Sequence, residues 1–484
     1  MAHSYFFYLT IETMKKNINL TEGSIFKSLI LLSVPIVLAN ILQTAYQLTD
    51  TFWVGRLGTQ AVAAVSISFP MIFLIISLGG GLAMAGTILV AQYKGKNDQI
   101  AVNHIASQTL LMVTVVSAIL STIGYFLSPL LLKLMGATPD IYLDAVSYMK
   151  ISFIGMIFMF IFMVFQSLMR GVGDVKLPMY IVLGSVLLNL VFDPLFIFGY
   201  SFIPAFGVAG AAVATIMTQG LAAVVGIFLL VTGEYQIKLH PKDLKPDKPL
   251  IKKIFKLGFP ASIEQSTRAL GMVIMTFLVA TFGTLTIAAY GIGNRILSFV
   301  LIPAMGISMA TSTLVGQNIG AKKPQRVSSI VRLSNLISFI FLTLAGLIVF
   351  LWADNLSALF IPGDAQAIQS SALFVKIMAL TFGFIGIQMS LNGALRGSGD
   401  TKASMILSII SLWVLQFPLA YILSNYTGLA EVGLWIAFPV SNVIAALITV
   451  LWFKKGTWQK KQITEDIKLF TSISEETIIE EGLD

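Results

Sequence analysis

The sequence predicts an all-α membrane protein of twelve transmembrane helices arranged in two six-helix bundles. Three observations predict this fold class. The 484-residue chain is 56% hydrophobic and only 11% charged, more apolar surface than a water-soluble domain can bury. Long uncharged runs follow one another, several of them reaching the roughly 20 residues that cross a bilayer as one helix. In addition, the second half repeats sequence blocks of the first half.

Twelve spans result when the uncharged runs are divided at glycines, prolines and charged loops. We expect helices near residues 28–54, 60–92, 100–132, 142–169, 177–199, 207–232, 256–282, 285–316, 328–353, 367–395, 403–424 and 431–453.

The basic residues predict the orientation of these spans. With the N-terminus inside, the external loops hold only Arg56 and Lys133, and six of the 31 basic residues fall within the bounds of spans. The other 23 lie in the tails and the remaining loops. Because positively charged loops stay in the cytoplasm, we expect a multi-pass protein of the inner (plasma) membrane with both termini cytoplasmic.

The same pattern predicts the domain organisation. Segment 233–255 combines prolines with many lysines, as expected of a linker between two halves. Met14 is an alternative start of the chain, because the residues after it lead directly into the first span. We expect a cytoplasmic N-terminal segment 1–27, an N-terminal lobe 28–232, a cytoplasmic linker 233–255, a C-terminal lobe 256–454 and a cytoplasmic tail 455–484.

Three repeated blocks relate the two halves. Block 51–67 pairs with 276–292, block 81–95 with 306–320, and block 169–179 with 395–405. The first two pairs share one offset along the chain, and the third is shifted by a single position more. Six spans per half make both copies begin on the same side, so the repeat is parallel. Two bundles related in this way predict a central cleft and alternating access by rocking.

The first span carries an acid inside its apolar run. Residues 29–49 have no charge, and Asp50 follows them. A carboxylate at membrane depth is energetically expensive, so it normally faces a partner or a cavity and marks an ion or substrate path. Earlier in the same span, Pro35 removes a backbone hydrogen bond and predicts a hinge. The alternative is that Asp50 only bonds a neighbouring helix and Pro35 only sets a bend.

The fifth span carries a second acid. Asn189 and Asp193 are one helical turn apart and share one helix face. Asp50 and Asp193 each lie about 7–9 Å from the outer end of their span, at 1.5 Å per residue, and Thr215 in the next span reaches about the same layer. We expect these four residues to bind a proton or a Na⁺ ion. The alternative is a structural polar cluster.

The second half lacks this arrangement, because its span 403–424 contains no acid. Glu264 and Arg268, one helical turn apart in the seventh span, predict an internal ion pair. Together with Gln265 and with Arg295 in the eighth span, they are candidate polar residues of the cleft.

Other residue patterns exclude several functions. The chain has no cysteine and only three scattered histidines, so we expect no thiolate or histidine metal site and no cofactor. No nucleophile constellation indicates an enzyme. The net charge of +8 is sorted by membrane side, which argues against nucleic acid as a partner. The repeated R-G-x-G-D-x-K loops, which include Asp174 and Asp400, lack the phosphate-binding spacing and indicate tight turns.

The residues between Leu20 and Lys455 resemble the multidrug and toxic compound extrusion (MATE) transporters. The motifs that carry the resemblance are PIVLANILQTAYQLTDTFWVGRLG, LMRGVGDVKLPM, NLVFDP, GVAGAAVAT, GFPASIEQ and STLVGQNIGAKK.

This resemblance implies two six-helix lobes and cation-coupled antiport of organic compounds. Asp50, Asn189, Asp193 and Thr215 match the cation-site residues of prokaryotic members, closest to the DNA-damage-inducible F-like branch. Pro35 matches the proline at which the first helix bends in some members. The chain departs from the NorM-like branch, whose tenth helix carries an acid.

Two functions remain open at this stage. The first is a monomeric antiporter that exports amphipathic or cationic compounds in exchange for H⁺ or Na⁺. The second is a flippase of lipids or lipid-linked oligosaccharides from the same superfamily, which a strongly cationic cleft would favour.

Overall fold

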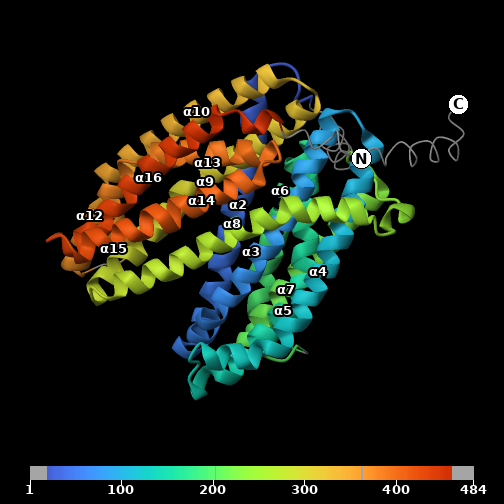
Figure 1. The fold of residues 1–484 in the computed structure, drawn as a ribbon. Helices are drawn as coiled ribbons and strands as arrows, with labels where there is room; N and C mark the ends of the chain where they lie inside the picture. Colours follow the sequence, from blue (N-terminus) through green and yellow to red (C-terminus); the bar gives the residue numbers. More distant parts are fainter. Residues whose placement is uncertain (1–18, 202, 361–362, 461–484) are drawn as a thin grey trace, which may run out of the picture. The chain divides into compact units, whose positions relative to one another are not determined.

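The computed structural model describes residues 19–201, 203–360 and 363–460, and these are almost entirely helical (Figure 1). Within these ranges there is no β-strand, only an isolated bridge between Tyr200 and Ile203. The predicted spans coincide with helices, except that span 367–395 is interrupted at Leu380 and Thr381. The alternative start at Met14, most of the predicted N-terminal segment and most of the tail lie outside the described residues.

The described residues of the first half form six long helices and a short 3-10 helix in the linker. They are α2 (Ile25–Gly55), α3 (Thr59–Gly95), α4 (Gln99–Leu134), α5 (Pro139–Val172), α6 (Lys176–Phe198), α7 (Val208–Thr232) and η1 (Pro241–Leu244).

The second half contains the same six spans with more interruptions. Its elements are α8 (Lys248–Ala280), α9 (Thr284–Gly320), α10 (Pro324–Leu351), α11 (Ala353–Phe360), α12 (Ala365–Ala379), α13 (Phe382–Gly397), α14 (Thr401–Ile409), the π-helix η2 (Ile410–Gln416), α15 (Phe417–Asn425), α16 (Ala430–Lys454) and η3 (Thr457–Lys460).

The membrane-spanning character of these helices follows from length and composition. In the described part of the chain, ten helices are long and apolar enough to cross a membrane, counting α14 to α15 as one. The pair α12 and α13, bent by 55°, makes an eleventh. The remaining predicted span is α8, whose 33 residues are less apolar because they include Glu264 and Arg268. The protein is therefore an integral membrane protein with the predicted fold class.

The internal repeat is present in the backbone as well as in the sequence. Helices α3 and α9 each have 37 residues and begin at equivalent positions of the repeat. The glycines before them, Gly58 and Gly283, have φ of 109° and 100°, which side chains with a Cβ rarely adopt. The turns after them place Asn97 and Lys322 at φ of 61° and 57°. The two halves thus share helix lengths and turn geometry.

The two copies differ in the spans that correspond to α5 and α6. Helix α5 is continuous, whereas its counterpart is broken between α12 and α13. Helix α6 is regular, whereas its counterpart contains η2. Pro418 lies just after η2, and its missing N–H cannot serve the carbonyl one turn earlier, which favours a local change in hydrogen-bond spacing.

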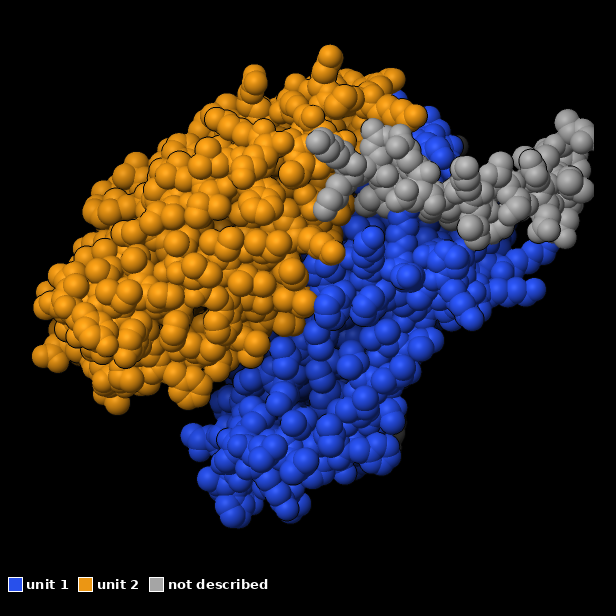
Figure 2. Space-filling model, in the orientation of Figure 1, with its two compact units in different colours: residues 1–20, 38–262, 463–484 blue, residues 21–37, 263–462 orange. Residues whose placement is uncertain are grey.

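The described chain forms two compact units, coloured separately in Figure 2. Unit 1 holds residues 19–20 and 38–262, and unit 2 holds residues 21–37 and 263–460. The unit boundary therefore lies within α2 and within α8, not in the loops that delimit the predicted lobes. In both helices it falls just after a proline, Pro35 or Pro260. These prolines are related by the same offset as the first two repeated blocks, so they are equivalent positions of the repeat.

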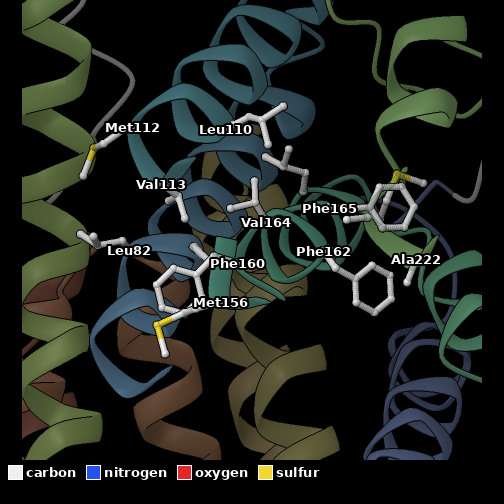
Figure 3. Packing of buried hydrophobic residues seen from close by; sticks show 14 of the residues in the cluster. Leu82, Leu110, Met112, Val113, Met156, Phe160, Phe162, Val164, Phe165 and Ala222 are labelled. Carbon is white, nitrogen blue, oxygen red and sulfur yellow. The ribbon is translucent and has the colours of Figure 1, made fainter. Parts of the chain in front are cut away.

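Each unit has its own apolar core. In unit 1, α5 packs against α3, α4 and α7 and supplies the buried rings of Phe160, Phe162 and Phe165 (Figure 3). In unit 2, the rings of Phe374 and Trp435 lie 4.5 Å apart between their centroids. Because lipid is as apolar as these side chains, helix packing depends on close van der Waals contact rather than on removal from water.

The linker is attached to α4 within unit 1. The two ring nitrogens of His104 lie 2.9 Å from Oδ1 of Asp243 and 3.1 Å from Oδ2 of Asp247. The side-chain amide of Gln108 donates to the backbone carbonyls of Asp243 and Lys245, both at 2.6 Å. These bonds fix the course of the linker before α8 begins.

Candidate functional site

Unit 1 brings together the four polar residues that the sequence selects, from α2, α6 and α7. Nδ2 of Asn189 donates to Oδ1 of Asp193 at 2.9 Å, and Oγ1 of Thr215 donates to Oδ2 of Asp50 at 3.4 Å. The carboxyl groups of Asp50 and Asp193 lie close enough to interact electrostatically. These residues from three helices form one cluster, as the depth argument from the sequence predicts. We call it the acid cluster.

Local helix geometry explains how the cluster forms. Asn189 and Asp193 are one turn apart on α6, and both are fully buried. Helix α7 approaches α6 closely at Gly210, where an added Cβ would overlap the carbonyl of Phe196. This small residue lets the two backbones approach, so the short side chain of Thr215 can reach Asp50.

The acid cluster contains oxygen atoms without partners. Among the described residues, Oδ1 of Asp50, Oδ1 of Asn189 and Oδ2 of Asp193 are buried and accept no hydrogen bond. Buried polar atoms are normally satisfied, and each exception needs an explanation. Carboxylate and amide oxygens are ligands for hard cations, and a carboxylate can alternatively take a proton. The cluster therefore has the chemistry to hold a Na⁺ ion or a proton.

Three neighbouring residues were not predicted. The hydroxyl groups of Tyr46 and Thr218 share a hydrogen bond of 2.5 Å, and both side chains are buried. Tyr148 of α5 also lies close enough to Asp50 to feel its charge. Helical spacing offered a signal for two of them, since Tyr46 precedes Asp50 by one turn and Thr218 follows Thr215 by about one turn.

Unit 2 contains a different cluster around Glu264, whose side chain is only 1% exposed. Its Oε1 lies 2.9 Å from Nη2 of Arg268, so the predicted ion pair is present, and 3.9 Å from Nη1 of Arg396. The hydroxyl groups of Ser404 and Ser408 donate to its two oxygens at 2.8 and 3.1 Å. Both carboxylate oxygens of Glu264 are therefore occupied.

The remaining candidates lie outside these two clusters. Gln265 is half-buried, and Arg295 is exposed on α9; neither bonds to Glu264. Pro35 lies inside α2, which continues unbroken past it to Gly55. Within the described ranges, no group of three His, Cys, Asp or Glu side chains could hold a metal ion.

The duplicated six-helix half and a buried acid cluster at membrane depth define the class of protein: a polytopic membrane transporter. The MatE family model matches residues 35–195 and 260–422, and the chain belongs to this family. The predicted MATE membership is thereby confirmed, whereas the assignment to one branch stays a prediction.

Relatives match over nearly the whole chain. The probable multidrug resistance protein YoeA of Bacillus subtilis is 29% identical, over 95% of this chain and 98% of its own. The probable multidrug resistance protein NorM of Thermotoga maritima is 31% identical, over 90% and 94%. A solved structure of a MOP superfamily transporter from Pyrococcus furiosus superposes with a TM-score of 0.86 at 25% identity, over 92% of this chain and 99% of that one.

Proposed function

We propose that the protein is a secondary active antiporter that exports amphipathic or cationic organic compounds in exchange for H⁺ or Na⁺ by alternating access. The relatives named as probable multidrug resistance proteins support export of varied compounds. The observation that carries the ion coupling is the set of three unpaired oxygens on Asp50, Asn189 and Asp193.

The coupling step follows from the charges of the acid cluster. Two carboxylates at close range repel each other, and a bound proton or Na⁺ removes this repulsion. The packing of α2 that is preferred with the ion then differs from the packing preferred without it. Pro35 gives α2 a place to bend. A change from 1:99 to 99:1 between two states needs about 5.5 kcal/mol of differential binding, which two desolvated acids can supply.

The experiment that tests this function is ion-driven dye efflux in proteoliposomes, with H⁺ and Na⁺ gradients set separately. We expect one or both gradients to drive a cationic dye against its concentration gradient. A rate of dye transport that is the same with and without each ion gradient would contradict antiport. Transport of a labelled lipid but not of the dye would favour the flippase.

The proposed orientation places both termini and the linker in the cytoplasm of a cell whose plasma membrane holds the protein as a monomer. The sorting of basic residues supports it. A single cysteine introduced at Lys245 should resist an impermeant thiol reagent in intact cells and react after permeabilisation. Ready labelling in intact cells would contradict the topology.

A further inference from the structure

One face of α9 exposes small and polar residues near its first third. Gly291, Arg295 and Ser298, spaced by one helical turn each, are all exposed. Arg295 forms no hydrogen bond or ion pair with any residue of the described ranges, and it lies well inside a membrane-spanning helix.

The depth of Arg295 makes this exposure costly in lipid. It lies about three helical turns from Thr284, the first residue of α9. At 1.5 Å per residue this is about 16 Å, roughly half of a hydrocarbon core of about 30 Å. A guanidinium at that depth faces water or an opposite charge rather than lipid tails.

Helix α10 of the same unit shows what a lipid-facing surface of this protein looks like. Its exposed stripe consists of large apolar side chains, including Leu336, Ile340, Leu344 and Leu347. The exposed face of α9 is more polar, because it includes Gly291, Arg295 and Ser298 as well as the exposed side chains of Ile287 and Phe299. This mixed surface suits contact with water at Arg295 better than a surface made only of large apolar side chains.

No acid of unit 2 among the described residues neutralises Arg295. Glu264 is bonded to Arg268 and lies near Arg396, so its cluster has two cations for one acid. Glu431 accepts a hydrogen bond from Thr286, and Asp354 is paired with Lys376. Arg295 is therefore an exposed guanidinium without a counter-ion among the described residues of unit 2.

We propose that Arg295 binds the anionic group of a transported amphipathic molecule: a carboxylate, sulfonate or phosphate. The planar guanidinium donates two parallel hydrogen bonds to such a group, and this pairing favours anionic and zwitterionic substrates. This inference rests on the proposed transport function and extends its substrate class beyond cations. A free organic anion and an anionic lipid headgroup share this chemistry.

The test compares substrates of opposite charge in proteoliposomes made with wild-type protein, Arg295→Gln and Arg295→Lys. The probes are a carboxylate-bearing dye, a cationic dye of similar size and a fluorescent phosphatidylglycerol. The matched control is Arg332→Gln, because Arg332 is an exposed arginine of the same unit on α10, toward the start of that helix.

We expect wild-type protein to transport the carboxylate dye or the anionic lipid, and Arg295→Gln to raise its KM about tenfold, as expected from losing about 1.5 kcal/mol of charge-assisted bonding. Transport of the cationic dye should be unchanged, Arg295→Lys should recover most anion transport, and Arg332→Gln should behave as wild type. The probe that responds to Arg295→Gln identifies whether the anion is a free compound or a lipid headgroup.

Two results would overturn the inference without affecting the proposed function: ion-driven transport of the cationic dye with rejection of both anionic probes, or an unchanged KM for anions in Arg295→Gln. Equal loss of all substrates in Arg295→Gln with no recovery in Arg295→Lys would also overturn it, because it would indicate a structural role.

If Arg295→Gln does not fold, competition between the two dyes in wild-type protein decides the question, since an anion site predicts that the carboxylate dye inhibits uptake of the cationic dye. Failure of the wild-type protein to couple any probe to an ion gradient would instead contradict the proposed function.

Discussion

The acids inside the two units differ in how many of their carboxylate oxygens accept hydrogen bonds. In unit 1, Asp50 and Asp193 lie together without a basic partner, and each keeps one oxygen without a hydrogen bond among the described residues. In unit 2, both oxygens of Glu264 are occupied by serines and arginine. An acid with a free oxygen can exchange a cation at little structural cost. An acid bound on both oxygens is tied to the packing of its helices.

The repeat shows that neither arrangement has a copy in the other half. When the repeated blocks are aligned, Asp50, Asn189 and Asp193 fall opposite apolar side chains, and Glu264 and Arg268 fall opposite uncharged ones. Arg396 of the Glu264 cluster, in contrast, falls opposite Arg170 of the repeated loop. Asp50 corresponds to Met275, Asn189 to Leu415, Asp193 to Leu419, Glu264 to Ala39 and Arg268 to Gln43. The backbone of the two halves stayed alike while their interior chemistry diverged. The comparison favours ion exchange in unit 1 and structural pairing in unit 2.

The largest effect is expected in the acid cluster. Asp50→Asn and Asp193→Asn should each reduce ion-driven efflux to background while leaving the protein folded, since asparagine keeps shape and polarity but cannot change charge. Efflux in proteoliposomes and elution on size exclusion measure the two properties. Asp144→Asn, at an exposed position of α5, is the matched control and should transport normally. Near-normal efflux by Asp50→Asn would contradict the assignment of ion exchange to unit 1.

A double-mutant cycle sharpens the same point. Residues that act as one unit give strongly non-additive losses. Adding Asp193→Asn to Asp50→Asn should therefore reduce the residual efflux rate little further. Independent losses that multiply would indicate two separate sites instead of one shared cluster.

Glu264→Gln should affect stability more than coupling. It leaves Arg268 and Arg396 without their counter-ion, and loss of hydrogen bonds to a buried charge costs about 2–3 kcal/mol. We expect a lower thermal unfolding temperature in detergent with ion-driven efflux retained. The control is Asp354→Asn, which breaks an ion pair that is 57% exposed on the Asp side and should cost less than about 1 kcal/mol. Loss of ion-driven efflux with an unchanged unfolding temperature would contradict the structural role of Glu264 and indicate a role in coupling.

The smallest effect is expected in the repeated loops, where the two halves agree. Burial raises the pKa of the Asp174 carboxyl, which lies between α5 and α6. The folded state therefore holds this proton more tightly than the unfolded state. The group's contribution to stability is greatest below its unfolded pKa of about 3.9 and falls as pH rises toward the raised folded value. Asp174→Asn should flatten this part of the pH profile, measured by thermal unfolding across an acid-to-neutral series. An unchanged profile would contradict the assignment to Asp174.

Much of this fold could be predicted because its signals are local or periodic. Uncharged runs located the spans, and the repeat blocks located the equivalent turns at Gly58 and Gly283. Helical spacing predicted the pair Glu264 and Arg268. The break between α12 and α13 was not predictable, because no proline or glycine stands at Leu380 and Thr381. Tertiary packing decides such a bend.

The candidate site was predictable to the same extent. Depth counting brought Asp50 and Asp193 to one layer, since both lie near the ends of helices. The partners of Glu264 on α14, Ser404 and Ser408, are at least 140 residues away along the chain. The bonds of His104 to the linker are equally distant. Such contacts depend on which helices become neighbours. A local sequence pattern does not predict this.

The unit boundaries within α2 and α8 have a consequence for biosynthesis. Residues 21–37 are synthesised before α3 to α7, yet their unit is completed only by α9 to α16, which are made later. In that unit, Lys323 and Arg326 bond the backbone of residues 21–23, and Gly306 packs against Val37. Unit 1, in turn, includes the start of α8 up to Ser262. Since domains of a nascent chain usually fold in order of their emergence, the start of α2 must wait in the membrane until the second half has been inserted.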